Sequence, residues 1–137
     1  MTAHENPFAG TWIANLSKSK RHPDNQFREA TLEFGMNGER LTITDIVVNA
    51  SGQEEKERHT ILIDGKEHPS ADGNGYFITA NWLGTHVLET TAKKRGEVVG
   101  RGMYLVSQDG QTLTISADQQ LIVCDRKENQ VREPNNI

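Results

Sequence analysis

The chain has one cysteine, Cys124, and no long apolar run. A single cysteine cannot form an intrachain disulfide, so nothing in the sequence requires an oxidising compartment. No stretch approaches the roughly 18 apolar residues of a membrane span, and the first residues lack the basic end and apolar core of a secretory leader. We therefore expect a cytoplasmic protein without a membrane span, or an exported one if a leader was trimmed.

Apolar and aromatic residues are also scarce. Aromatic residues make up 6% and hydrophobic residues 34% of the 137 residues, with a mean hydropathy of -0.66. This shortage favours a thin core, or a hollow sheet with a polar lining, over a solid globule. The net charge of -4 argues against the dense basic surface that nucleic-acid binding needs.

Helical periodicity is missing as well, and strand patterns take its place. Runs rich in Thr, Val, Ile, Phe and Tyr are separated at short intervals by Gly, Asn and Asp. Asn-Gly and Asp-Gly pairs supply the positive φ angles of tight hairpin turns, so neighbouring strands are predicted to be antiparallel. Nine strands are predicted, at residues 10–16, 27–34, 40–50, 56–63, 76–83, 85–91, 98–107, 112–117 and 121–127.

The length fits a single domain, 1–137, with an ordered barrel at about 8–128 and a loose tail at 129–137. A row of hairpins leaves two sheet edges, and closing the sheet into a barrel removes them. We therefore predict an all-β fold, a single antiparallel up-and-down barrel of 8–10 strands, in preference to a sandwich.

The segment Phe8-Ala9-Gly10-Thr11-Trp12 resembles the entry motif of the calycin barrels, which include the lipocalins and the intracellular fatty-acid-binding proteins. The resemblance implies that Trp12 lies across the closed end of the barrel beside Gly10. It also implies that a cation from the last strand, here Arg126, packs over the indole and joins the first strand to the last. These three residues are expected to form a structural plug.

The last three predicted strands are similar to those of fatty-acid-binding proteins, in which an Arg-x-Tyr pair holds a carboxylate. This chain has Arg126-Lys127-Glu128 instead, and an acid in place of the tyrosine would repel a carboxylate. The segment between residues 16 and 27 is too short for the two-helix lid of those proteins and contains Pro23. The chain therefore resembles a lidless, lipocalin-like barrel of a bacterial type.

Strand alternation suggests which side chains line the interior. The bulky candidates are Phe34, Trp82, Met103, Tyr104 and Leu105, and Arg101 is a charged candidate that could anchor an anion. Two glycines flank Arg101, and glycine within a strand suggests a bulge that could re-aim that side chain. An arginine within a strand is nevertheless more often found on a solvated face, and this interpretation of Arg101 is the favoured one.

The five histidines show no metal-ligand spacing, and Cys124 has no histidine near it in the sequence, so no metal site, cofactor or catalytic residue is predicted. His59 and His86 are ordinary strand histidines in this interpretation, although either could act as a general base or as an axial haem ligand of the nitrobindin kind. The charged run 54–58 is interpreted as a solvated strand edge that discourages aggregation.

These observations favour non-catalytic binding of a small hydrophobic or amphipathic molecule inside the barrel. Two alternatives stay open. One is an isomerase or cyclase acting on a hydrophobic substrate in the same cavity, which requires an inward His, Tyr or acid with a perturbed pKa. The other is a structural or partner-binding module with a filled barrel and an apolar outer patch.

Overall fold

The computed structural model describes residues 6–21, 23, 26–70, 74–117 and 120–127. The predicted tail at 129–137 lies outside this range. Ten strands and one short 3-10 helix follow one another along the chain: β1 (Gly10–Ala14), η2 (Leu16–Lys18), β2 (Glu29–Asn37), β3 (Arg40–Val48), β4 (Glu54–Leu62), β5 (His68–Pro69), β6 (Tyr76–Gly84), β7 (Val87–Lys94), β8 (Glu97–Val106), β9 (Thr112–Ala117) and β10 (Gln120–Arg126).

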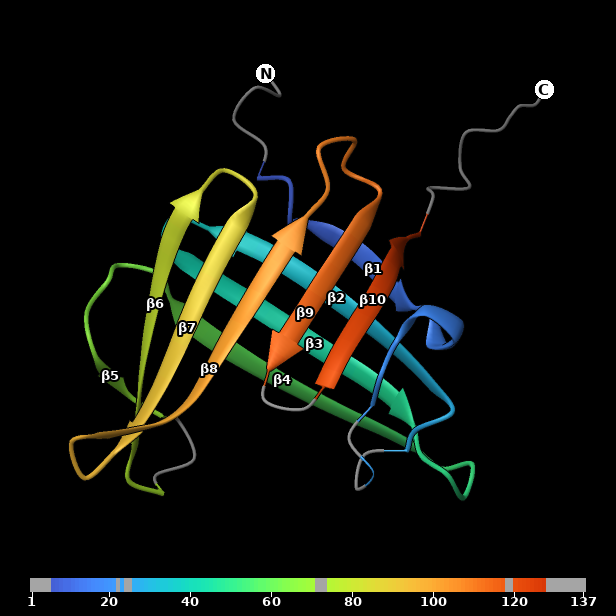
Figure 1. Ribbon diagram of the computed structural model, residues 1–137, viewed down its shortest axis with the longest axis horizontal. Helices are drawn as coiled ribbons and strands as arrows, with labels where there is room; N and C mark the ends of the chain where they lie inside the picture. The colour runs from blue at the N-terminus through green and yellow to red at the C-terminus, as the bar shows by residue number, and fades with distance from the viewer. Residues whose placement is uncertain (1–5, 22, 24–25, 71–73, 118–119, 128–137) are drawn as a thin grey trace.

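All ten strands belong to one antiparallel sheet, in the order β4-β3-β2-β1-β10-β9-β8-β7-β6-β5. The first and last strands pair side by side, with Trp12 opposite Arg126. Figure 1 shows the sheet curling on itself, so that β2, β3 and β4 pass behind β6 to β9 and cross them. The predicted all-β, up-and-down barrel is confirmed, and the additional strand is the two-residue β5.

The closure of the barrel is incomplete, and this corrects the expectation that it leaves no edges. In the described part of the chain, β4 and β5 are the two ends of the hydrogen-bonded order. β4 still comes close to β6, so the two ends of the sheet face each other across a seam. Every residue of β4 up to Thr60 is exposed, which confirms the charged run 54–58 as a solvated edge strand.

The turns follow the glycine pattern of the sequence. Positive φ is found at Gly38, Gly65 and Gly110, which follow Asn or Asp, and also at Gly52 and Gly96, which follow Ser51 and Arg95. Among the described residues between β1 and β2, the one regular element is the 3-10 helix η2, so that stretch contains no helical lid. No helix in the described residues is long and apolar enough to cross a membrane.

The core fills one part of the interior with apolar side chains from almost every strand. Its largest fully buried members are Trp12, Phe8, Leu41, Leu88, Leu113 and Cys124. Strand register places these residues on a shared inner face, because Leu88 lies opposite Tyr104, Tyr104 opposite Ile115, and Leu113 opposite Cys124. The same register identifies the inner face of every other strand.

Candidate functional site

Trp12 and Arg126 pack together where β1 pairs with β10. Trp12 is completely buried on β1, and the guanidinium carbon of Arg126 lies 4.2 Å from the centre of its ring. The indole Nε1 donates a hydrogen bond of 2.9 Å to the carbonyl of Phe8. The stacking implied by the calycin resemblance is therefore present, and it joins the first strand to the last.

Arg126 also holds the segment that leads into β1. Its guanidinium donates to the backbone carbonyls of Pro7, Ala9 and Gly110 at distances of 2.6, 2.8 and 2.7 Å. Gly10 has a φ of +124°, and a Cβ atom there would lie 2.6 Å from Nη1 of Arg126. The arginine thus contacts both the backbone and the indole, and joins the segment before β1 to the end of β10.

Phe34, Trp82 and Tyr104 come together inside the barrel as an aromatic cluster. Phe8 lies between two of them, with ring-centre distances of 6.4 Å to Phe34 and 5.4 Å to Trp82. Tyr104 meets Phe34 edge to face at 6.2 Å. These three predicted interior residues do face inward, but much of their surface contacts one another and the core.

Arg101, Met103 and Leu105 lie on the other face of β8, which corrects the interior position predicted for them. Tyr104 and Val106 point inward on this strand, and the pairing with β7 runs without interruption from Arg101 to Leu105. Alternation therefore turns the odd-numbered side chains outward, and Arg101 is exposed. The predicted bulge exists, but it lies beyond Gly100, between Ala92 and Lys93 of the partner strand, and does not re-aim Arg101.

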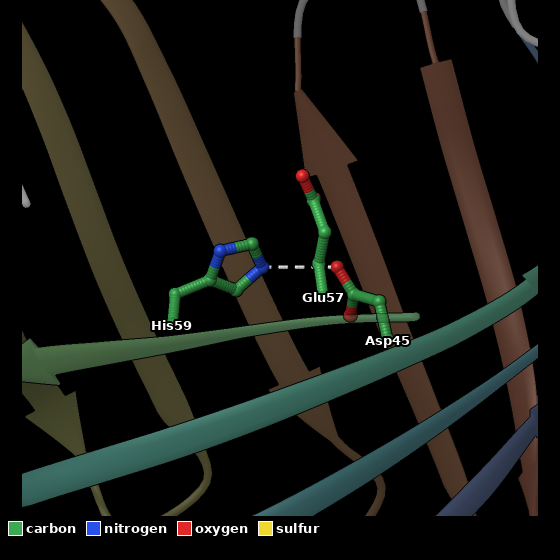
Figure 2. Close-up of side chains that lie close together, drawn as sticks. All are labelled: Asp45, Glu57 and His59. Carbon is green, nitrogen blue, oxygen red and sulfur yellow. Dashed lines mark hydrogen bonds and ion pairs between the residues drawn. The ribbon is translucent and has the colours of Figure 1, made fainter. Parts of the chain in front are cut away.

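A polar group lies on the inner face of β3 and β4 that sequence reasoning did not identify. Asp45 continues the inward row of Leu41 and Ile43, and the register places Glu57 opposite Asp45 and His59 opposite Ile43. Nε2 of His59 lies 3.0 Å from Oδ2 of Asp45. Figure 2 shows His59 and Asp45 pointing toward one another from the two strands, with the side chain of Glu57 extending past them. We call these three residues the polar trio.

The polar trio is inward-facing and yet reachable by solvent. The side chain of His59 is 48% exposed and that of Asp45 is 27% exposed. Within the residues that the structure describes, Oδ1 of Asp45 is buried and has no hydrogen-bond partner. β4 is one end of the hydrogen-bonded order, so solvent reaches these inward side chains from the edge of the sheet.

Tyr104, on β8, faces the same interior as the polar trio on β3 and β4. Burial raises the pKa of its phenol above the ordinary value of 10.0, and the negative charge of Asp45 raises that pKa further. Tyr104 on β8 and Asp45 on β3 therefore face the same interior and interact electrostatically across it. The interior combines an apolar aromatic wall with an acidic, histidine-containing wall.

The sequence did contain a signal for the polar trio. Glu57, His59, Ile61 and Ile63 are spaced two residues apart, so they share one face of the strand. Ile63 is buried, which indicates that this is the inner face. Because residues 54–58 are all charged, inner and outer positions could not be told apart there by an alternation of apolar and polar residues. Of the other histidines, His68 pairs with Asp64 at 2.9 Å, His86 lies in the turn between β6 and β7, and His4 and His22 lie outside the described residues.

Comparison with known proteins shows the fold. No family model matches the chain, and no curated protein sequence matches it. Among solved structures, the wild-type fluorescent protein UnaG is similar with a TM-score of 0.60 at 16% identity, over 93% of this chain and 100% of that one. The REP1-NXSQ fatty acid transporter gives 0.62 at 15% identity, over 89% and 97%. As-p18, an extracellular fatty acid binding protein, gives 0.59 at 11% identity, over 89% and 97%. The chain has the calycin fold.

Proposed function

We propose that the protein binds a small amphipathic molecule inside its barrel, without transforming it. The observation that carries this proposal is the polar trio, whose side chains point inward by register and remain open to solvent. Two solved structures with the same fold are described as a fatty acid transporter and a fatty acid binding protein, which supports an interior site for a molecule with an apolar part.

The two walls of the interior differ in polarity, and each fits one end of an amphipathic ligand. Tyr104 and Trp82 offer partly buried apolar surface, while the trio brings two carboxylates and one imidazole. Arg126 is engaged at the closed end and Arg101 lies outside, so neither predicted cation is placed to neutralise a carboxylate ligand in the interior. A ligand whose polar end is cationic or donates hydrogen bonds fits this wall better than an anionic one.

A displacement experiment tests the proposal. Nile red, an uncharged dye that fluoresces in apolar surroundings, is titrated into the full chain, and dodecyltrimethylammonium or dodecanoate is added below its micellar concentration. We expect saturable, blue-shifted dye fluorescence that the cationic compound displaces at lower concentration than the anionic one. If no saturable dye binding and no stabilisation by either compound is found, the proposed function is wrong.

A matched pair of variants locates the binding. The double variant Asp45→Asn/Glu57→Gln removes two inward charges, and Glu29→Gln/Glu33→Gln removes two charges from the outer face of β2. The inward variant should lose the preference for the cationic compound while the outward variant keeps it. An equal loss in both variants would mean that net charge, and not the interior, sets the preference.

The two alternatives drawn from the sequence remain predictions. His59 and Tyr104 both face the interior, as an enzyme of the isomerase or cyclase type would need. The outer surface carries exposed apolar residues such as Leu83 and Leu105, as a partner-binding module would need.

A further inference from the structure

We propose that Asp45, Glu57 and His59 form a binding site for one divalent transition-metal ion of the Zn²⁺ type. This inference goes beyond the binding of an organic molecule. It concerns the same residues that would contact the polar end of the proposed ligand, so a bound ion would compete with a cationic head group, and the dye displacement above is carried out on metal-free protein. The three residues each offer one ligand atom, and these atoms all lie within 4.8 Å of one another.

The arrangement of the donor atoms fits such an ion. Ligand atoms bound to one Zn²⁺ at about 2.0–2.2 Å are separated from each other by roughly 3.0–3.5 Å. Nε2 of His59 and Oδ2 of Asp45 are already 3.0 Å apart. Glu57 is on the neighbouring inward position of the same strand as His59, and its long side chain needs only a rotation about its χ angles to complete the set.

A second observation comes from Asp45 itself. Among the described residues, its Oδ1 is buried and without a hydrogen-bond partner, which is costly for an ionised carboxylate. A cation bound at Oδ2 would neutralise the charge that Asp45 and Glu57 place side by side, and would so lower the cost of keeping the carboxylate of Asp45 ionised with one buried oxygen unpaired. The imidazole nitrogen selects the class of metal, because Mg²⁺ and Ca²⁺ prefer oxygen ligands whereas Zn²⁺ readily accepts nitrogen.

The strands make the site partly preorganised. Asp45 and Glu57 are direct partners in the antiparallel ladder between β3 and β4, and His59 lies two residues further along β4. Backbone pairing therefore fixes the three Cα positions before any ion arrives. The exposure of His59 leaves a route for the ion and a position for water as a fourth ligand.

The test uses the untagged full chain, freed of metal with a chelator and without any organic probe. Zn²⁺ is titrated calorimetrically, and Co²⁺ is added separately because its visible absorption reports a coordination sphere that contains protein ligands. We expect one Zn²⁺ per chain, a Co²⁺ spectrum that Zn²⁺ abolishes, and no comparable response to Mg²⁺ or Ca²⁺.

Variants decide where the ion binds. His59→Gln and Glu57→Gln should each weaken Zn²⁺ binding by at least about tenfold. His86→Gln, in the turn between β6 and β7, and Glu33→Gln, on the outer face of β2, should leave it unchanged. Far-ultraviolet circular dichroism verifies that each variant is folded.

Three results would overturn the inference: no Zn²⁺ binding by the wild-type chain, Zn²⁺ binding of unchanged affinity in His59→Gln, or binding of Ca²⁺ and Zn²⁺ with equal affinity. The last outcome would show that the acidic wall attracts cations without coordinating them. Because dye displacement and metal titration are separate measurements, either proposal can fail while the other stands.

Discussion

A Cβ atom placed on Gly10 would lie 2.6 Å from Nη1 of Arg126, although the two residues are at opposite ends of the barrel sequence. The φ of +124° at this position is also one that L side chains rarely adopt. We predict that Gly10→Ala destabilises the fold by about 2 kcal/mol or more, from backbone strain and displacement of the arginine. Urea unfolding followed by tryptophan fluorescence measures the change.

Gly35→Ala is the matched control for this substitution. Gly35 lies in β2, and a Cβ there meets nothing within 4 Å. Its free energy of unfolding should stay within about 0.5 kcal/mol of wild type or rise slightly, because alanine reduces the freedom of the unfolded chain. Equal destabilisation by both substitutions would contradict the special position of Gly10.

Arg126→Ala should lower the free energy of unfolding by about 3 kcal/mol. The substitution removes the stacking on Trp12 and leaves three backbone carbonyls without the donor that now reaches them. Arg126→Lys should recover only part of the loss, since an ammonium cannot reproduce the planar fork of the guanidinium. Chemical denaturation of both variants measures these differences.

Arg101→Ala provides the comparison for the arginine substitutions. Arg101 is exposed on the outer face of β8, so its removal should change stability by no more than about 0.5 kcal/mol and should not alter dye binding. If Arg101→Ala abolished dye binding, the assignment of this side chain to the outer face would be wrong.

Alkaline pH should destabilise the protein through Cys124. Burial raises the pKa of its thiol from 9.0 to about 12, and the charge of Asp125 adds to the rise. The unfolded chain therefore loses this proton above about pH 9 while the folded chain keeps it. The stabilisation is complete below pH 9 and is lost as the pH rises toward 12. Cys124→Ala should show a shallower fall of stability over this range.

Thiol chemistry gives an independent measurement of the same burial. Cys124 has no exposed surface, so a thiol reagent such as dithionitrobenzoate should react with the folded protein far more slowly than with the unfolded protein at pH 8. Rapid and complete reaction under native conditions would contradict the buried position.

The fold could be predicted from the sequence because its signals are local. Hairpin turns are marked by glycines, several of them preceded by Asn or Asp, and strands by β-branched runs, so nearly every element was found within a few residues of its observed bounds. The pairing of β1 with β10 is not local, and it was predicted only through the resemblance carried by Gly10, Trp12 and Arg126. The two-residue β5 is too short to leave a pattern.

Which residues face the interior was harder to predict, because an error of one residue in the register of a strand turns all of its side chains to the opposite face. Phe34, Trp82 and Tyr104 were placed inward correctly, whereas Arg101 and Met103 were not, since the expected bulge lies beyond them. Glu57 was missed for a different reason. Charged residues on an edge strand suggest solvent, and only the pairing of β3 with β4 shows that every second one of them points into the barrel.

The most direct measurement of the central claim is a crystal structure of the full chain with dodecyltrimethylammonium. The account predicts the alkyl chain inside the barrel, between β3 and β4 on one side and the wall that carries Tyr104 on the other, with the ammonium group beside Asp45 and Glu57. An interior fully occupied by protein side chains, with the compound absent or bound only to the outer surface, would contradict it.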